Sequence, residues 1–191
     1  GLKYGAGFND YLLCEFYNLT DAQRATYITR SVNNTLVSLL NDREYYHFFD
    51  NKSEFYTTFG KYIGRQWLDF GKATQKEFED FMASRDTIMV KPDSSSGGFG
   101  VNKLSKGDFP NLAAMYQKLK EEHIGVIEDV LQQHEVLNQL NPSSINTLRV
   151  VTILNESGPH IVYAHIRIGN SDRPVDNLHS GGMFAPIDLD K

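Results

Sequence analysis

The stretch Ile88–Leu104 constrains the fold most, because it consists of two short strands joined by a loop of serine and glycine. The first strand is apolar and ends in Lys91, and the loop continues to Gly100. Glycines let backbone N–H groups turn toward a ligand, and consecutive N–H groups in such a turn bind anions. A lysine beside the loop adds a point charge suited to phosphate. We therefore expect a hairpin that clamps the phosphates of a nucleotide.

Two better-known phosphate-binding loops do not fit this stretch. A P-loop needs G-x-x-x-x-G-K-[ST] at the start of a helix, whereas Lys91 precedes the loop. A dinucleotide fingerprint needs G-x-G-x-x-G, but Lys103 stands where the third glycine belongs. Runs of serine and glycine are also typical of plain hairpin loops. A loop without a ligand is therefore the alternative.

Residues 1–70 are expected to be helical. Thr20-Asp21 is a typical helix N-cap, and apolar residues recur every three or four positions up to Leu40. This spacing predicts one helix over 22–40 with one packed face, ended by Asn41-Asp42. An aromatic-rich stretch, 45–59, follows, and we expect its rings in the core, with hydrogen-bond partners for the tyrosine hydroxyls.

Three further elements are predicted around the strand–loop–strand. Thr74-Gln75-Lys76-Glu77 has the pattern of a capping box and begins a helix that carries apolar side chains up to Met82. A second helix is expected after Asp108, with apolar residues from Leu112 to Leu119 on one face, and Gly125 breaks the pattern. Residues 126–130 are then expected to form a short strand.

An antiparallel hairpin is predicted from residues 146–154 and 160–168, which are β-branched and alternating, with a turn at 155–158. One face of its second strand should carry Ile161, Tyr163, His165 and Arg167. An arginine on an apolar face needs an anion, so Arg149 and Arg167 are expected to meet one phosphate. Two separate surface arginines are the alternative.

The composition sets limits on partners and location. The formal net charge is −5, which does not favour a nucleic acid as partner. No apolar run approaches the length of a membrane span, and the start lacks the pattern of a signal peptide. The single cysteine, Cys14, cannot form an internal disulfide and is expected to be a small buried hydrophobe. Together these features predict a cytoplasmic protein.

Taken together, these segments resemble the ATP-grasp superfamily, and in particular the sugar-transfer-associated ATP-grasp proteins, which are found with enzymes that build polysaccharides. The resemblance covers nearly the whole chain and rests on five segments in the family's order. These are Asn51-Lys52, Val90-Lys91-Pro92 with Gly97-Gly98-Phe99-Gly100, Val126-Ile127-Glu128, residues 146–152 and residues 175–182.

The resemblance implies an α+β, ATP-grasp fold, in which two α/β subdomains clasp a nucleotide. The expected parts are a helical N-terminal region over 1–72, a small subdomain with the phosphate loop over 73–127, and an incomplete C-terminal subdomain over 128–191.

The resemblance also implies which residues bind ATP. Lys52 and Lys91 match the two lysines that contact the α- and β-phosphates. The loop that closes over the phosphates matches Ser96, Gly97, Gly98 and Gly100. Glu128 to Val130 match the segment that meets the adenine. Thr147 falls where a ribose-facing acid often sits, and a threonine there departs from the superfamily's pattern.

The implied chemistry is ATP-dependent ligation. A carboxylate is activated as an acyl phosphate, and an amine-type nucleophile then displaces the phosphate. Arg149 and Arg167 match positions that face the γ-phosphate or the acyl phosphate, and Asn177 and His179 match the loop beside the reacting groups. The partners implied are ATP, a carboxylate and a sugar-linked acceptor, within bacterial cell-surface polysaccharide biosynthesis.

Superfamily members hold Mg²⁺ with an acidic residue and a Glu-x-Asn motif near the C-terminal end. Nothing after Gly182 offers that motif, so we expect a fragment that lacks C-terminal strands, with the Mg²⁺ ligands beyond Lys191. A non-catalytic nucleotide-binding or regulatory module, and an ATP-dependent kinase on the same fold, stay open as alternatives.

Overall fold

The structure, a computed structural model of the chain, describes residues 2–94, 99–170, 176–177 and 181–190. It divides into two compact units, Gly1–Phe49 and Asp50–Lys191. Residues 50–72 lie in the second unit. The division into three parts at residues 72 and 127 stays a prediction.

The first unit is helical, but the helix expected over 22–40 is two helices. Its elements are α1 Phe8–Leu13, α2 Asp21–Ala25, α3 Arg30–Leu40 and most of α4 His47–Asp50. Thr20 caps α2 as predicted. A second cap breaks the run, because the Thr29 hydroxyl accepts a hydrogen bond from the Val32 N–H at 3.5 Å and starts α3.

Three expectations about packing in residues 1–59 are wrong. No residue of α3, all of which the structure describes, is buried, so the predicted packed face is not formed. The aromatic stretch over 45–59 is only partly core, since Tyr56 is buried whereas Tyr45 and Phe49 are exposed. Cys14 is also half-buried rather than buried.

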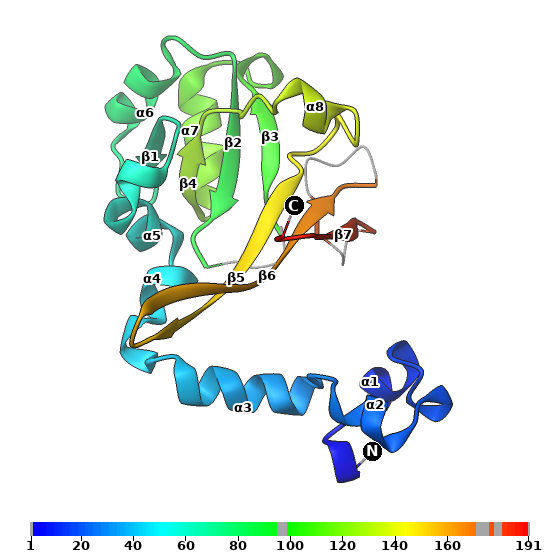
Figure 1. The fold of residues 1–191 in the computed structure, drawn as a ribbon. Coiled ribbons are helices and arrows are strands. Elements are labelled where there is room, and N and C mark those ends of the chain that lie inside the picture. The colour runs from blue at the N-terminus through cyan, green and yellow to red at the C-terminus, as the bar shows by residue number, and fades with distance from the viewer. Residues whose placement is uncertain (1, 95–98, 171–175, 178–180, 191) are drawn as a thin grey trace. The chain divides into compact units, whose positions relative to one another are not determined.

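The second unit contains a four-stranded antiparallel sheet (Figure 1). Its strands are β1 Trp67–Asp69, β2 Thr87–Pro92, β3 Asn102–Ser105 and β4 Ile124–Glu128, in the order β1-β4-β2-β3. The pairing of β2 with β3 confirms the hairpin predicted from the Ser/Gly stretch. Helix α5, Lys52–Thr58, precedes β1.

The core lies between this sheet and two helices, α6 Gln75–Met82 and α7 Leu112–Glu121. The buried cluster consists of Phe70, Phe78, Met82, Ile88, Val90, Met115, Leu119, Ile124 and Ile127. The capping box at the start of α6 is confirmed, since the Thr74 hydroxyl accepts from the Glu77 N–H at 3.3 Å and the Glu77 carboxylate accepts from the Thr74 N–H at 2.7 Å. Because Ile88 and Val90 face this core, the alternate β2 residues lie on the other face of the sheet.

The second sheet is a three-stranded antiparallel sheet in the order β5-β6-β7. Its strands are β5 Thr147–Asn155, β6 Gly158–Ile168 and β7 Met183–Ile187, and the short helix α8, Glu135–Asn138, precedes them. The predicted hairpin is confirmed. Both sheets are antiparallel and helices pack on the first, so the predicted α+β class is confirmed as well.

A bulge in this hairpin changes which residues share a face. Tyr163 pairs with Val151, but Ile161 pairs with Thr152, so the register shifts by one residue. Since directly paired residues lie on the same face, Ile161 is on the face opposite to Tyr163, and the prediction that they share a face is wrong.

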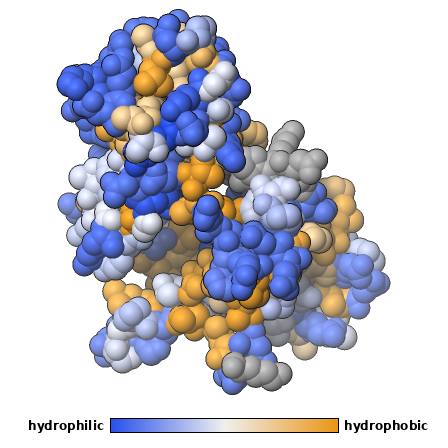
Figure 2. All heavy atoms as spheres, turned by 90° about the horizontal axis from the view of Figure 1, so that it is seen from above, coloured by the Kyte–Doolittle hydropathy of each residue, from blue (hydrophilic) through white to orange (hydrophobic). Residues whose placement is uncertain are grey.

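Several apolar side chains of this sheet are exposed, among them Leu148, Leu154, Met183 and Phe184. Figure 2 shows hydrophobic residues reaching the surface among hydrophilic ones.

Candidate functional site

A cleft of about 380 Å³ lies on the face of the first sheet that points away from α6 and α7, and it extends to β5. Five residues predicted from the sequence line it together: Lys91, Glu128, Val130, Thr147 and Asn177. They come from β2, β4, β5 and two loop segments, so the fold brings distant parts of the chain to one cavity. Four other predicted residues, Ser96, Gly97, Gly98 and His179, lie outside the described residues.

Strand register places Lys91 beside Glu128 on the cleft face. Lys91 pairs with Val126 on β4, and Met89 pairs with Glu128, so Lys91 and Glu128 are diagonal neighbours across the two strands. The Lys91 ammonium lies 2.5 Å from Glu128 Oε1. The Glu128 side chain is only 4% exposed, and a carboxylate buried to this degree needs cationic partners.

A buried hydroxyl joins this ion pair to a second cation. Arg65, two residues before β1, places its Nη2 atom 2.8 Å from Glu128 Oε2. The Tyr56 hydroxyl donates to Glu128 and accepts from Arg65 Nη2 at 2.7 Å and from Lys91 Nζ at 3.1 Å. We call Tyr56, Arg65, Lys91 and Glu128 the Glu128 socket. The Tyr56 ring also meets the Trp67 ring edge-on, with ring centroids 5.1 Å apart.

Burial sets the protonation behaviour of the socket. It lowers the pKa of Lys91, while the negative charge of Glu128 and its hydrogen bond act in the opposite direction. Burial, and then the charge of Glu128, raise the pKa of Tyr56 above its ordinary value. Tyr56 is therefore a neutral hydroxyl at physiological pH, and Glu128 opposes the loss of charge from Lys91.

Lys52, the other predicted phosphate lysine, is held at the start of α5 near the root of the Ser/Gly loop. Its backbone N–H and its ammonium each donate to the Asp93 carbonyl at 3.2 Å. Burial lowers the pKa of Lys52, and the charge of Lys91 lowers it further, so the two lysines are within electrostatic range of each other. Lys52 is not among the described residues that line the cleft.

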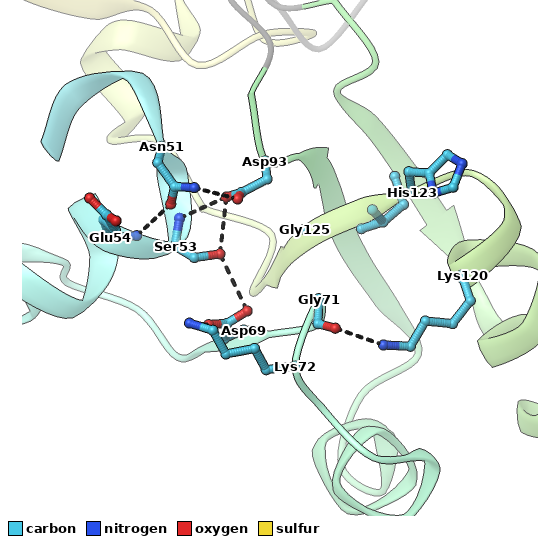
Figure 3. Close-up of a pocket in the computed structure, with 11 residues that line it drawn as sticks. Asn51, Ser53, Glu54, Asp69, Gly71, Lys72, Asp93, Lys120, His123 and Gly125 are labelled. Carbon is cyan, nitrogen blue, oxygen red and sulfur yellow. Dashed lines mark hydrogen bonds and ion pairs between the residues drawn. The ribbon is translucent and has the colours of Figure 1, made fainter. Parts of the chain in front are cut away.

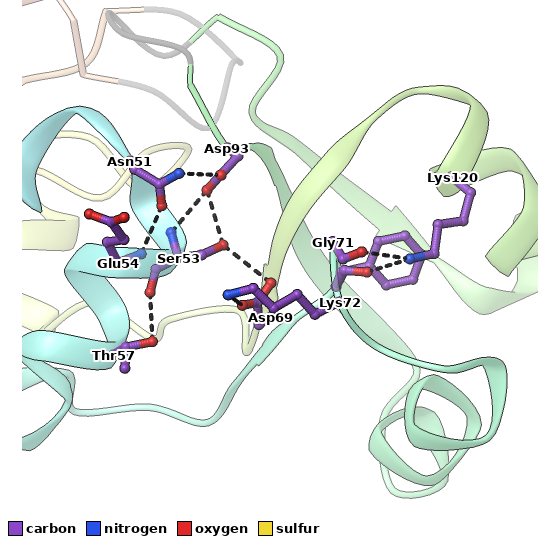
Figure 4. Close-up of polar contacts among 10 residues, drawn as sticks. Asn51, Ser53, Glu54, Thr57, Asp69, Gly71, Lys72, Asp93 and Lys120 are labelled. Carbon is purple, nitrogen blue, oxygen red and sulfur yellow. Dashed lines mark hydrogen bonds and ion pairs between the residues drawn. The ribbon is translucent and has the colours of Figure 1, made fainter. Parts of the chain in front are cut away.

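The Asp93 carboxylate fixes the root of the loop to α5 (Figure 4). It accepts from Asn51 Nδ2 at 2.6 Å, from the Ser53 N–H at 2.9 Å and from the Ser53 hydroxyl at 3.0 Å. We call Asn51, Ser53 and Asp93 the Asp93 anchor. Gly125 permits it, because a Cβ there would lie 2.8 Å from the Asp93 backbone nitrogen and Cα. Asn51 also accepts from the Glu54 N–H at 2.8 Å and so caps α5.

The Asp93 anchor forms part of a second hollow, of about 450 Å³, in which Lys72 and Lys120 have partners within the protein (Figure 3). Lys72 pairs with Asp69 at 2.9 Å, and the Lys120 ammonium donates to the Phe70 and Gly71 carbonyls. None of the predicted nucleotide or catalytic residues that the structure describes lines this hollow. The contacts around this hollow hold the root of the Ser/Gly loop, and the cleft remains the candidate site.

Gly100, at the other end of the loop, is a position where only glycine fits. Its φ is +71°, a conformation that L side chains rarely adopt, and a Cβ there would lie 2.6 Å from Pro92 Cγ. The structure thus explains why position 100 is a glycine. The contact of Gly100 with phosphate stays a prediction.

On the opposite wall, Thr147 meets Asp176, a carboxylate that the sequence reasoning did not single out. Arg167 contacts the same pair, although neither Arg167 nor Arg149 is among the described residues that line the cleft. Asp176 is 5% exposed and accepts from the Thr147 hydroxyl and, at 3.1 Å, from the Thr147 N–H. Arg167 donates to the Thr147 hydroxyl oxygen at 2.9 and 2.7 Å and lies 3.3 Å from Asp176 Oδ1. In this structure the anion beside Arg167 is therefore Asp176. Arg149 is exposed and pairs with His165, which puts it on the same face as Arg167.

Sequence reasoning missed Tyr56, Arg65 and Asp176, whose roles come from contacts between distant segments; Tyr56 and Glu128 are 72 positions apart. Two of them had a signal. Asp176 lies inside a stretch already noted for its resemblance, and Tyr56 lies in the aromatic stretch over 45–59, whose tyrosine hydroxyls were expected to have hydrogen-bond partners. Two buried polar atoms, Ser144 Oγ and Arg65 Nε, have no hydrogen-bond partner among the described residues. Ser144 lines the cleft.

In the described part of the chain, no three His, Cys, Asp or Glu side chains are grouped so as to hold a metal ion. None of the helices that the structure describes has the length and apolar character needed to cross a bilayer.

The sequence model of a family described as sugar-transfer associated ATP-grasp matches residues 31–191. No curated protein matches the chain.

Proposed function

The chain belongs to the sugar-transfer-associated ATP-grasp family, and from this premise we propose that it binds ATP in the cleft between its two sheets. One observation carries the proposal. In the Glu128 socket two cations, Arg65 and Lys91, face a single carboxylate. The socket therefore has one positive charge in excess, and Lys91 presents it at the cleft wall. An anionic ligand such as a nucleotide phosphate balances that charge.

The predicted roles are kept as part of this proposal. Lys91 and Lys52 contact the α- and β-phosphates, and the Ser/Gly loop closes over them. Glu128 to Val130 border the adenine, and Thr147 borders the ribose. Asn177 lies beside the reacting groups, with Arg149 and Arg167 on one face of β5 and β6.

We infer that the reaction is a carboxylate–amine type of ligation. A carboxylate oxygen of one substrate attacks the γ-phosphorus of ATP, the bond to the β-phosphate oxygen breaks, and ADP leaves. The acceptor's nucleophile then attacks the acyl carbon, releases phosphate and gives up its proton. Cationic groups preorganised in a cleft suit such a reaction, because phosphoryl transfer depends on positioning and on neutralisation of charge. A sugar-linked acceptor follows from the family's association with sugar transfer.

The described residues do not form a metal cluster, so no step here is assigned to Mg²⁺, and its binding stays a prediction. When bound, Mg²⁺ would neutralise phosphate charge.

Calorimetric titration with Mg-ATP tests the proposal. We expect the wild type to bind and Lys91→Ala to bind about 10- to 100-fold more weakly, which is the effect of losing one hydrogen bond to a charged group. Lys76→Ala is the matched control, because Lys76 is exposed on α6 and pairs only locally, with Asp80 at 3.0 Å. It should bind like the wild type.

The absence of wild-type binding would refute the proposal, and equal binding by Lys91→Ala would move the phosphate site away from β2. Product analysis then separates the chemistries. A ligase releases ADP and phosphate only when both a carboxylate and a nucleophile are present, whereas a kinase leaves the phosphoryl group on its product.

A further inference from the structure

Two residues of the Glu128 socket, Tyr56 and Arg65, are not among the described residues that line the cleft, whereas Lys91 and Glu128 are. Arg65 reaches Glu128 through Oε2, and Lys91 reaches it through Oε1. The carboxylate is thus held at both oxygens, from the cleft side by a lysine and from behind by an arginine.

The two cations differ in their roles when Lys91 moves away from Glu128. If Lys91 turns toward a ligand, Glu128 keeps Arg65 at 2.8 Å and the Tyr56 hydroxyl, so its charge stays compensated. Without Arg65, the same movement would leave a carboxylate that is 4% exposed without a cation. A buried charge that loses its partner is strongly unfavourable.

Tyr56 links the two sides. A tyrosine hydroxyl has one proton to donate and can accept two hydrogen bonds. Here the proton goes to Glu128, and the two accepted bonds come from Arg65 and Lys91. All three positions are used, so the hydroxyl fixes both cations relative to the carboxylate.

We propose that Arg65 and Tyr56 are positioning residues, which hold Glu128 so that Lys91 can exchange this carboxylate for a phosphate group of the nucleotide. The inference rests on the proposed binding of ATP in the cleft. It adds that Lys91 changes partner on binding, and that Arg65 makes this exchange possible without contacting the ligand.

If Lys91 exchanges Glu128 for a phosphate group, the binding of ATP should depend on pH in a way that Arg65 alters. Burial is the main cause that lowers the pKa of Lys91, and the charge of Arg65 lowers it further. Binding to protonated Lys91 is lost as the pH rises through this pKa, so removal of the Arg65 charge should move the loss to higher pH. Among the described residues, the other charged or titratable groups around Lys91 or along the cleft are Glu128 on β4, Tyr56 and Lys52 on α5, Lys103 on β3, and Asp176. All of these stay in place in the variants of Arg65.

The experiment is calorimetric titration of Mg-ATP into the full chain, across a range from about pH 7 to pH 11. We expect Arg65→Gln to bind at least about tenfold more weakly at neutral pH, with its alkaline loss of binding shifted upward. Arg65→Lys should stay within about threefold of wild type, because one nitrogen, Nη2, makes both contacts, and an ammonium can replace it. Arg43→Gln, at an exposed position in the first unit, is the control and should bind like wild type.

Tyr56→Phe keeps the test decisive if Arg65→Gln does not fold, as judged by circular dichroism. It should weaken binding about three- to tenfold. If the wild type binds Mg-ATP and both Arg65→Gln and Tyr56→Phe bind it with the same affinity, the inference is overturned and the proposed function stands. Weakened binding without the upward pH shift and without recovery in Arg65→Lys would also overturn it, since a general structural defect explains that result. No binding by the wild type would refute the proposed function and, with it, this inference.

Discussion

At the scale of single residues, Tyr56 gives the protein a dependence on alkaline pH. The pKa of Tyr56 is raised above its ordinary value of 10.0, by burial first and by Glu128 next. A group whose pKa is raised by folding contributes stability that is fully present below the unfolded pKa and is lost above it. We therefore expect the free energy of unfolding to fall more steeply above pH 10 in the wild type than in Tyr56→Phe.

Urea unfolding at a series of pH values measures this difference. Tyr62→Phe removes the same hydroxyl from a side chain that is 73% exposed and serves as the matched control. Parallel curves for the wild type and Tyr56→Phe would show that the socket does not hold the hydroxyl in its protonated form.

At the scale of elements, the Asp93 anchor connects the end of β2 to the start of α5. Asp93→Ala removes the acceptor of the Ser53 N–H, and Ser53 is 5% exposed. Loss of hydrogen bonds to a charged group should lower the free energy of unfolding by about 2–4 kcal/mol. Asp86→Ala is the control, because the Asp86 side chain is 85% exposed and pairs with Lys106 at the surface. A similar small effect of both substitutions in urea unfolding would contradict the anchor.

Elements were predictable from the sequence where a local signal marked their ends. The capping box at Thr74 and the turn at 155–158 located α6 and the β5–β6 hairpin correctly. The helix over 22–40 was wrong, because apolar residues keep the same period on both sides of the break, while Thr29 starts a new helix by capping it. The bulge that moves Ile161 to the other face was equally invisible, since the residues still alternate along the strand.

In the candidate site, too, residues were predictable only where a local sequence motif marked them. Residues with a motif around them, such as Lys91 and Glu128, were predicted and line one cleft. Arg65 has no motif, and its contact with Glu128 exists only once β1 pairs with β4. Single-sequence reasoning identified residues that line the cleft, whereas the partners behind them depend on tertiary contacts.

At the scale of the whole molecule, the cleft, the Glu128 socket and the Asp93 anchor all lie in the second unit. A unit with its own core can keep its local structure. We therefore expect residues 50–191 alone to bind Mg-ATP within about threefold of the full chain. Calorimetry on residues 50–191 and on the 191-residue chain checks this, and a loss of affinity with unchanged circular dichroism would mean that the first unit contributes to the site.

The edge-on contact between Tyr56 and Trp67 has a practical consequence. Trp67 is the chain's one tryptophan, and it pairs with Glu128 across β1 and β4. The intrinsic fluorescence of the protein therefore originates beside the residues that we expect to rearrange when Lys91 changes partner. The molecule carries its own optical reporter, and the emission of an unlabelled sample should follow the occupancy of the cleft in real time.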